Sequence, residues 1–213
     1  MRAQKTETEV RQEQIVTAAL ELIGAQGVNA LSIAGIAERV GIVPSALYRH
    51  FKCKDDVLDA VLDLLKARLL SNVTQVRKET PGALPRLKSL LMRHARMLSE
   101  NRAIPLVVFS DGIYAGRPER KAKVAAIITG YLSKIQHIVE EGIQDGSIRK
   151  DVVPVTASVM FLGMILPAAV LWNVSEGNFD MNAHAENAWP AFVRCISTEE
   201  HNIKSYMKTC EET

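Results

Sequence analysis

The chain has few cysteines, and their placement excludes two kinds of site. Its 213 residues include three, Cys53, Cys195 and Cys210, which are widely spaced and form no CxxC pair. This odd number fits reduced thiols, as in cytoplasm, and predicts neither a disulfide framework nor a zinc site. Cys53 lies between Lys52 and Lys54, whose cations favour a thiolate, so a redox role for Cys53 stays open.

Motifs of catalysis are also missing. The sequence contains no glycine-rich phosphate loop, no nucleophile elbow, no HExxH pair and no alternating pattern that predicts strands. We therefore expect no enzyme activity, no catalytic residue, no metal and no cofactor.

The longest apolar run is short for a membrane-spanning helix. From Val159 to Trp172 it has fourteen residues and contains Gly163 and Pro167, whereas a bilayer requires roughly 20. The first residues hold no apolar region of a secretion signal. We expect a cytoplasmic protein with no membrane partner, in which other protein segments cover this run.

Charge is nearly balanced over the whole chain, and basic character is local. The net charge is only +2, which excludes a nonspecific polycation. Residues 39–54, however, contain no acid and four basic side chains, namely Arg39, Arg49, Lys52 and Lys54.

The pattern around this basic stretch predicts short helices joined by a tight turn. Gly41 suits the left-handed conformation that ends a helix, and Pro44 suits the first turn of a new helix, expected to reach about Phe51. Ser32 is placed as the N-cap of the helix before the turn. An apolar stripe over residues 15–23 predicts a third helix that shares their core.

The helix after the turn would have one polar face. At helical spacing Ser45, Tyr48, Arg49 and Lys52 lie on one side, and apolar residues lie on the other. A basic run alone usually means a solvated surface. Here it coincides with a helix-turn-helix and an aromatic residue on the exposed face, which favours double-stranded DNA as the partner.

These residues resemble the N-terminal domain of the TetR family of transcriptional regulators. The likeness covers about residues 10–60 and rests on Leu31–Ile33, Ile36–Ile42, the Ser-Ala-Leu-Tyr-Arg-His-Phe string of Ser45–Phe51, and Lys54–Leu58. It implies a homodimer that binds a two-fold operator and responds to a small-molecule effector.

The resemblance also implies roles for single residues. Tyr48, His50 and Lys54 would bind phosphates, whereas Ser45 and Arg49 would lie near base edges. The full set of expected DNA contacts is Ser32, Pro44, Ser45, Ala46, Tyr48, Arg49, His50, Lys52 and Lys54.

Three positions depart from the family pattern. Val43 and Cys53 stand where members usually have capping residues, so we expect weak side-chain caps on the two helices that follow. Asp55 and Asp56 still suit the dipole of the second of these helices. Ala34 replaces a polar residue of many members, which predicts few base contacts from its helix.

Helical periodicity continues beyond this region, with apolar stripes over residues 56–76, 84–100 and 117–146 and no strand pattern. The predicted fold class is all-α, with a three-helix DNA-binding domain followed by a larger helical domain. The expected organisation is a flexible arm at 1–9, the DNA-binding domain at 10–54, an effector-binding and dimerisation domain at 55–200 and a tail at 201–213.

Two polar side chains, His94 and Tyr131, interrupt these stripes on inward faces. Each can bond to a backbone carbonyl or a neighbouring side chain, or both can be polar contacts in a mostly apolar effector cavity. The apolar stripe points to a largely hydrophobic effector. The expected effector residues are His94, Met97, Phe109, Tyr131, Met164 and Trp172.

The family places its last two long helices in a two-fold four-helix interface, which residues 154–172 and 184–197 match. The alternative is a core helix of a monomer, but a dimer would offer two recognition helices about one turn of DNA apart. The expected interface residues are Met160, Met164, Ile165, Val170, Trp189 and Phe192.

The resulting prediction is a dimeric, effector-responsive transcriptional regulator, which we expect to be a repressor. The alternative is a DNA-binding regulator or architectural protein that a protein partner or redox change controls.

Overall fold

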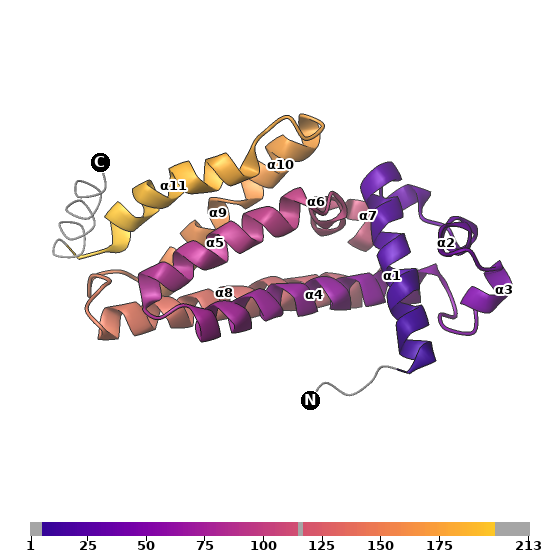
Figure 1. The fold of residues 1–213 in the computed structure, drawn as a ribbon, viewed down its shortest axis with the longest axis horizontal. Helices are drawn as coiled ribbons and strands as arrows, with labels where there is room; N and C mark the ends of the chain where they lie inside the picture. Colours follow the sequence, from indigo (N-terminus) through magenta and orange to yellow (C-terminus); the bar gives the residue numbers. More distant parts are fainter. Residues whose placement is uncertain (1–5, 115–116, 199–213) are drawn as a thin grey trace. The chain divides into compact units, whose positions relative to one another are not determined.

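The computed structural model describes residues 6–114 and 117–198 (Figure 1). Within these ranges the chain forms eleven α-helices and one short 3-10 helix, and its extended pairing is limited to an antiparallel bridge between Ile148 and Ser197. The all-α prediction is confirmed. The chain divides into two compact units: unit 1 comprises residues up to 68 and residues 100–127, and unit 2 comprises residues 69–99 and those from 128 onwards.

Unit 1 begins with α1 (Glu7–Gln26), η1 (Val28–Ala30), α2 (Ile33–Val40) and α3 (Pro44–Leu47). A reciprocal cap starts α1, because the Thr6 hydroxyl accepts from the Glu9 N–H and the Glu9 carboxylate accepts from the Thr6 N–H. Gly41 ends α2 with φ 75° and ψ 35°, the left-handed conformation that the sequence predicted.

The helix after the turn is shorter than we expected, because α3 ends at Leu47. Residues 48–50 continue as tight turns, in which the Arg49 N–H bonds to the Ala46 carbonyl at 3.3 Å and the His50 N–H to the Leu47 carbonyl at 2.9 Å. Such i to i+3 bonds are usual where a helix tightens at its end. As expected, Val43 supplies no side-chain cap to α3.

The remaining elements of unit 1 are α6 (Ala103–Phe109), α7 (Asp111–Tyr114) and the first halves of α4 (Lys54–Glu79) and α8 (Pro118–Gln144). Helix α6 packs closely on α1, since a Cβ added to Gly24 would lie 3.3 Å from the Ala103 nitrogen. The expected boundary between residues 54 and 55 falls inside unit 1 and stays a prediction.

Unit 2 contains the second halves of α4 and α8 with α5 (Ala83–Ser99), α9 (Pro154–Gly163), α10 (Leu166–Val174) and α11 (Met181–Ile196). Helices α10 and α11 both pack against α5 (Figure 1). Apolar side chains from these helices fill the core, among them the fully buried Leu87, Leu90, Leu91, Ile135, Ile138 and Phe161.

The apolar segment of unit 2 is not the single helix that we expected for residues 154–172. It is broken between α9 and α10, because Pro167 has no N–H to donate to the Gly163 carbonyl. At the break, the His184 ring Nε2 hydrogen-bonds to the Met164 carbonyl oxygen at 2.9 Å. By length and composition the segment Pro154–Val174 could cross a membrane, but 44% of its most apolar window is buried within the protein.

Candidate functional site

The residues around α3 separate into a buried anchor and an exposed polar surface. Leu47 is fully buried, whereas Ser45, Tyr48, Arg49 and Lys52 are exposed, with 53% of Tyr48 accessible. The two faces predicted from helical spacing are therefore present, although the chain leaves the α-helix after Leu47. Their contacts with DNA stay a prediction.

The basic residues of this surface differ in their partners. Arg39 donates from Nε to the Glu21 carboxylate at 2.8 Å, across an exposed pair. The side chains of Arg49, Lys52 and Lys54 make no hydrogen bond or ion pair within the described residues, so their charge remains available to a ligand.

Capping groups fix the backbone on both sides of this surface. The Ser32 hydroxyl accepts from the Gly35 N–H at 3.1 Å, which confirms its predicted N-cap role. Before α4, the Lys52 N–H donates to the Asp56 carboxylate at 2.9 Å. Sequence reasoning missed this bond, although an acid in the first turn of a helix is its usual signal.

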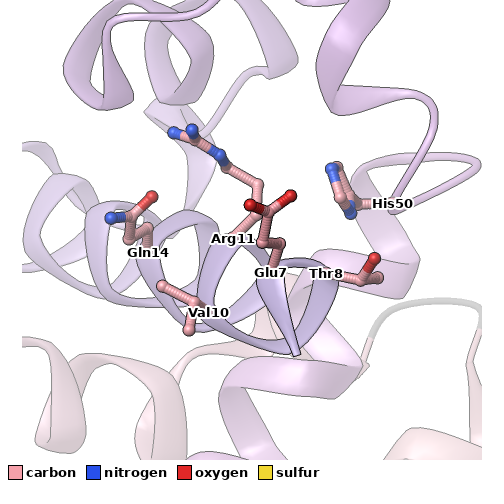
Figure 2. A pocket seen from close by; sticks show the side chains of 6 residues that line it. All are labelled: Glu7, Thr8, Val10, Arg11, Gln14 and His50. Atoms are coloured by element: carbon pink, nitrogen blue, oxygen red, sulfur yellow. The ribbon is translucent and has the colours of Figure 1, made fainter. Parts of the chain in front are cut away.

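A surface hollow of about 500 Å³ lies between the first turns of α1 and His50 (Figure 2). The His50 Nδ1 atom is buried and has no hydrogen-bond partner among residues 6–114 and 117–198. The side chains around the hollow are Glu7, Thr8, Val10, Arg11, Gln14 and His50. The structure thus brings Arg11 and Gln14, which sequence reasoning did not single out, next to a predicted phosphate contact.

His94 and Tyr131 lie together in unit 2 and satisfy one another. His94 is 4% and Tyr131 2% exposed, and the Tyr131 hydroxyl lies 3.2 Å from His94 Nδ1 with the rings edge to face. Burial lowers the pKa of His94 to about 4 and raises the pKa of Tyr131, so both are neutral at pH 7. The two side chains are therefore hydrogen-bonded to one another, which matches the expectation that each bonds to a neighbouring side chain.

The other expected effector residues are less closely grouped. Met97 and Trp172 are buried, Met164 is half-buried, and the side chain of Phe109 lies outside the described residues. A hollow of about 560 Å³ in unit 2, between α4 and α8, is lined by none of the expected set but by Leu70, Val73, Thr74, Arg77, Ser133, Lys134, Gln136, His137 and Glu140. The effector residues stay a prediction.

The expected interface residues fall into two groups. Met160 and Val170 are exposed at 47% and 43%, and Met164 and Trp189 are half-buried. Ile165 and Phe192, by contrast, are 0% and 5% exposed because they pack in the core of their own protomer. Sequence reasoning missed the most exposed apolar side chains of this region, which are Val153, Val155, Val159, Leu171 and Val174.

Among the described residues, no group of three or more His, Cys, Asp or Glu side chains is placed to hold a metal ion. Cys53 and Cys195 are both exposed free thiols, and Cys210 lies outside the described residues.

Two family models match the chain. The model for bacterial regulatory proteins of the tetR family matches residues 15–61, and the model for the C-terminal region of YsiA-like protein matches residues 65–195. Among individual proteins, the fatty acid metabolism regulator protein of Bacillus subtilis (strain 168) is 25% identical over 170 residues, which are 80% of this chain and 87% of that protein.

Solved structures share the fold. The fatty acid degradation regulator FadR from Bacillus halodurans superposes with a TM-score of 0.76 at 20% identity, over 89% of this chain and 96% of its own. FadR from Bacillus subtilis in complex with stearoyl-CoA superposes with a TM-score of 0.74 at 24% identity, over 85% of this chain and 97% of its own. At these identities the likeness shows the fold alone.

Proposed function

The chain belongs to the TetR family of bacterial transcriptional regulators and carries a YsiA-like C-terminal region; from this premise we propose that it is a dimeric repressor, released from a two-fold operator by a long-chain acyl-CoA. Binding DNA through a helix-turn-helix, without catalysis, is the activity of the family. The dimer, the effector, the sign of regulation and the cytoplasmic location are our proposals.

The DNA-binding surface rests on the exposed residues around α3. Within the part of the chain that the structure describes, no side chain pairs with the Arg49 guanidinium, so it can pair with guanine in the major groove. Tyr48 and Lys54 flank Arg49 in the sequence and supply a hydroxyl donor and a cation for phosphates. Because DNA sites of this family type are read by two recognition helices, one such surface per protomer calls for a dimer.

Exposed apolar side chains on α9 and α10 support the dimer. Val155, Val159 and Met160 on α9, with Leu171 and Val174 on α10, are each between 47% and 75% exposed. Monomeric proteins rarely leave so many large apolar residues of one region in water, so a second copy of this chain would stabilise them by covering them.

The acyl-CoA proposal rests on the relatives and on the interior of unit 2. The B. subtilis FadR was solved in complex with stearoyl-CoA, and the B. subtilis relative is named for fatty acid metabolism. In this chain the apolar interior of unit 2 includes the Tyr131–His94 pair. A thioester carbonyl only accepts hydrogen bonds, and a Tyr131 hydroxyl that turned away from His94 would donate one.

The test is release of DNA by defined ligands. An operator is first selected from a pool of randomised duplexes with the wild-type protein, and its affinity is followed by fluorescence anisotropy. We expect stearoyl-CoA to release it, whereas stearate or coenzyme A alone should do so at least tenfold less well.

Tyr131→Phe is the matched variant, because it removes only the hydroxyl. We expect it to bind the operator like the wild type and to need several-fold more stearoyl-CoA for release. No selected operator would overturn the DNA proposal. An operator that no acyl-CoA releases would overturn the effector proposal and leave the DNA proposal intact.

A further inference from the structure

Unit 1 contains a buried arginine that the DNA-binding surface does not use. Arg120, in the first turn of α8, is 4% exposed. Its Nε donates to Asp59 at 2.9 Å, one terminal nitrogen donates to the Asp55 carboxylate at 3.1 Å and to the Asp55 carbonyl at 3.3 Å, and the other donates to the Ile113 carbonyl at 3.4 Å. One guanidinium therefore joins the first turns of α4 to α7 and α8.

Two outer ion pairs flank this buried one. Arg117 pairs with Asp55, and Lys123 pairs with Asp63 at 2.8 Å while also donating to the Asp59 carbonyl at 2.9 Å. Cations three residues apart, the first of them just before α8, thus face acids four residues apart on α4. The outer cations are 47% and 29% exposed, whereas the Arg120 guanidinium is 4% exposed and water reaches this cluster through its partners Asp55 and Asp59, which are 31% and 44% exposed.

Stability alone is a poor reason for a buried guanidinium. Taking charges out of water is costly, and apolar residues of similar volume often stabilise a core as well or better. What a guanidinium adds is geometry, because its planar fork holds several acceptors in fixed positions. Its hydrogen bond to Asp59 is the main cause that raises the pKa of Arg120, so the fork stays charged.

The held turn of α4 is joined directly to the DNA-binding surface. Asp55 follows Lys54, a predicted phosphate contact, and Asp56 accepts the Lys52 N–H at 2.9 Å. The segment from His50 to Lys54 therefore leads into the first turn of α4. In that turn Asp56 accepts a hydrogen bond from the backbone of the segment, and Asp55 accepts one from Arg120.

We propose that Arg120 is a positioning residue for DNA binding, which fixes the first turn of α4 and, through it, the segment of His50 to Lys54 that contacts phosphates. The inference rests on the proposed DNA-binding function, and it adds a residue remote from the DNA-binding surface. Helix α8 continues without a break from Arg120 into unit 2, where it carries Tyr131.

The test compares Arg120→Met with Lys123→Met in the full chain. Methionine keeps an unbranched apolar stem in both, so the variants differ in whether the buried guanidinium or the flanking half-buried ammonium is lost. Hydrogen exchange of the peptide covering residues 48–60 is measured first, since it needs neither operator nor effector. We expect exchange to rise at least tenfold in Arg120→Met and less than twofold in Lys123→Met. Equal exchange in both variants would overturn the proposal.

Operator binding is the second measurement. We expect Arg120→Met to bind the selected operator at least tenfold more weakly than the wild type. It should also discriminate less against operators with one or two extra base pairs between the half-sites, because a loosely held segment tolerates wrong spacing. A purely structural role would lower the unfolding temperature but leave both affinity and spacing preference unchanged in the folded protein, which would also overturn the proposal.

Arg120→Lys keeps the charge, and it replaces Arg120→Met in both measurements if Arg120→Met does not fold. A single ammonium cannot reach Asp55, Asp59 and the Ile113 carbonyl in the geometry of the fork, so we expect the same two effects at reduced size. A wild-type-like Arg120→Lys would overturn the proposal. If the wild type selects no operator, the DNA-binding proposal fails, and the exchange measurement still decides whether Arg120 holds this segment.

Discussion

Units 1 and 2 distribute polar and apolar side chains in opposite ways. In unit 1, Tyr48 and Arg49 project into water above the buried Leu47. In unit 2, the polar pair of His94 and Tyr131 is enclosed, and apolar side chains on α9 and α10 are exposed. The first surface is complete in a single chain and suits a charged, hydrated partner. The second is the surface that we propose a second copy of the chain covers, and the enclosed polar pair is the one that we propose meets a ligand.

The largest effect should come from placing a charge at a buried apolar position of unit 2 and comparing it with a charge at an exposed apolar position. Ile165→Glu puts an unpaired charge into the core, and we expect it to lower the free energy of unfolding by at least about 3 to 5 kcal/mol. Val170→Glu lies at an exposed position, so the protomer should stay folded while the dimer dissociates. Urea unfolding and sedimentation velocity report the two quantities.

Val170→Gln is the uncharged control and should weaken the dimer less than Val170→Glu. If Ile165→Glu instead yields a folded monomer of normal stability, then Ile165 is an interface residue and the division that we draw within unit 2 does not hold.

The second effect concerns the enclosed pair of His94 and Tyr131. The pKa of His94 is about 4 in the folded chain, against 6.5 for an ordinary histidine. Between these pH values the unfolded chain binds more protons, so stability is complete above pH 6.5 and is lost as the pH falls to about 4. The loss should reach roughly 3 kcal/mol, at about 1.4 kcal/mol for each pKa unit.

The double variant His94→Leu, Tyr131→Phe removes both polar groups at similar volume. Thermal unfolding measures the stability of both proteins between pH 6.5 and 4. As the pH falls, we expect the stability of the double variant to decline less steeply than that of the wild type. Parallel pH curves for the two proteins would show that His94 is not the group that titrates.

The contrast between the units also explains what could be predicted from the sequence. The backbone signals of unit 1 are local, so the Ser32 cap, the Gly41 stop and the Pro44 start were predictable from single residues. The early end of α3 was not, since helical spacing does not distinguish a second helical turn from the tight turns that replace it.

The expected single helix over residues 154–172 was wrong, and which of its apolar residues are buried depends on long-range packing. Helical spacing places Ile165 and Val170 on an apolar segment but does not show which of them faces α5 and α11. Because the helix breaks near Pro167, α9 and α10 each have their own orientation about the helix axis. Arg120 was not predicted either, since its acidic partners lie more than sixty residues away in the sequence.

The third effect separates sequence recognition from phosphate binding within unit 1. Arg49→Ala should remove about 1 to 3 kcal/mol of the preference for the operator over random DNA. Lys54→Ala should weaken binding to both duplexes alike and make the affinity less dependent on salt. Anisotropy titrations at several fixed salt concentrations measure both. If Arg49→Ala weakened binding to operator and to random DNA equally, Arg49 would not recognise bases.

The smallest effect should come from the exposed ion pair of unit 1. Arg39 and Glu21 are 43% and 55% exposed, so Arg39→Gln should change the free energy of unfolding by less than about 1 kcal/mol. Urea unfolding checks this value. A loss as large as that of Ile165→Glu would mean that surface charge, rather than the apolar core, holds the helices of unit 1 together.

The most direct test of an effector-released DNA-binding dimer is reciprocal coupling between its two ligands. Operator affinity is measured with and without saturating stearoyl-CoA, and stearoyl-CoA affinity with and without saturating operator. Linkage requires the two factors to be equal, and we expect both to exceed about tenfold. Tight binding of each ligand with a factor of one in both directions would contradict the account.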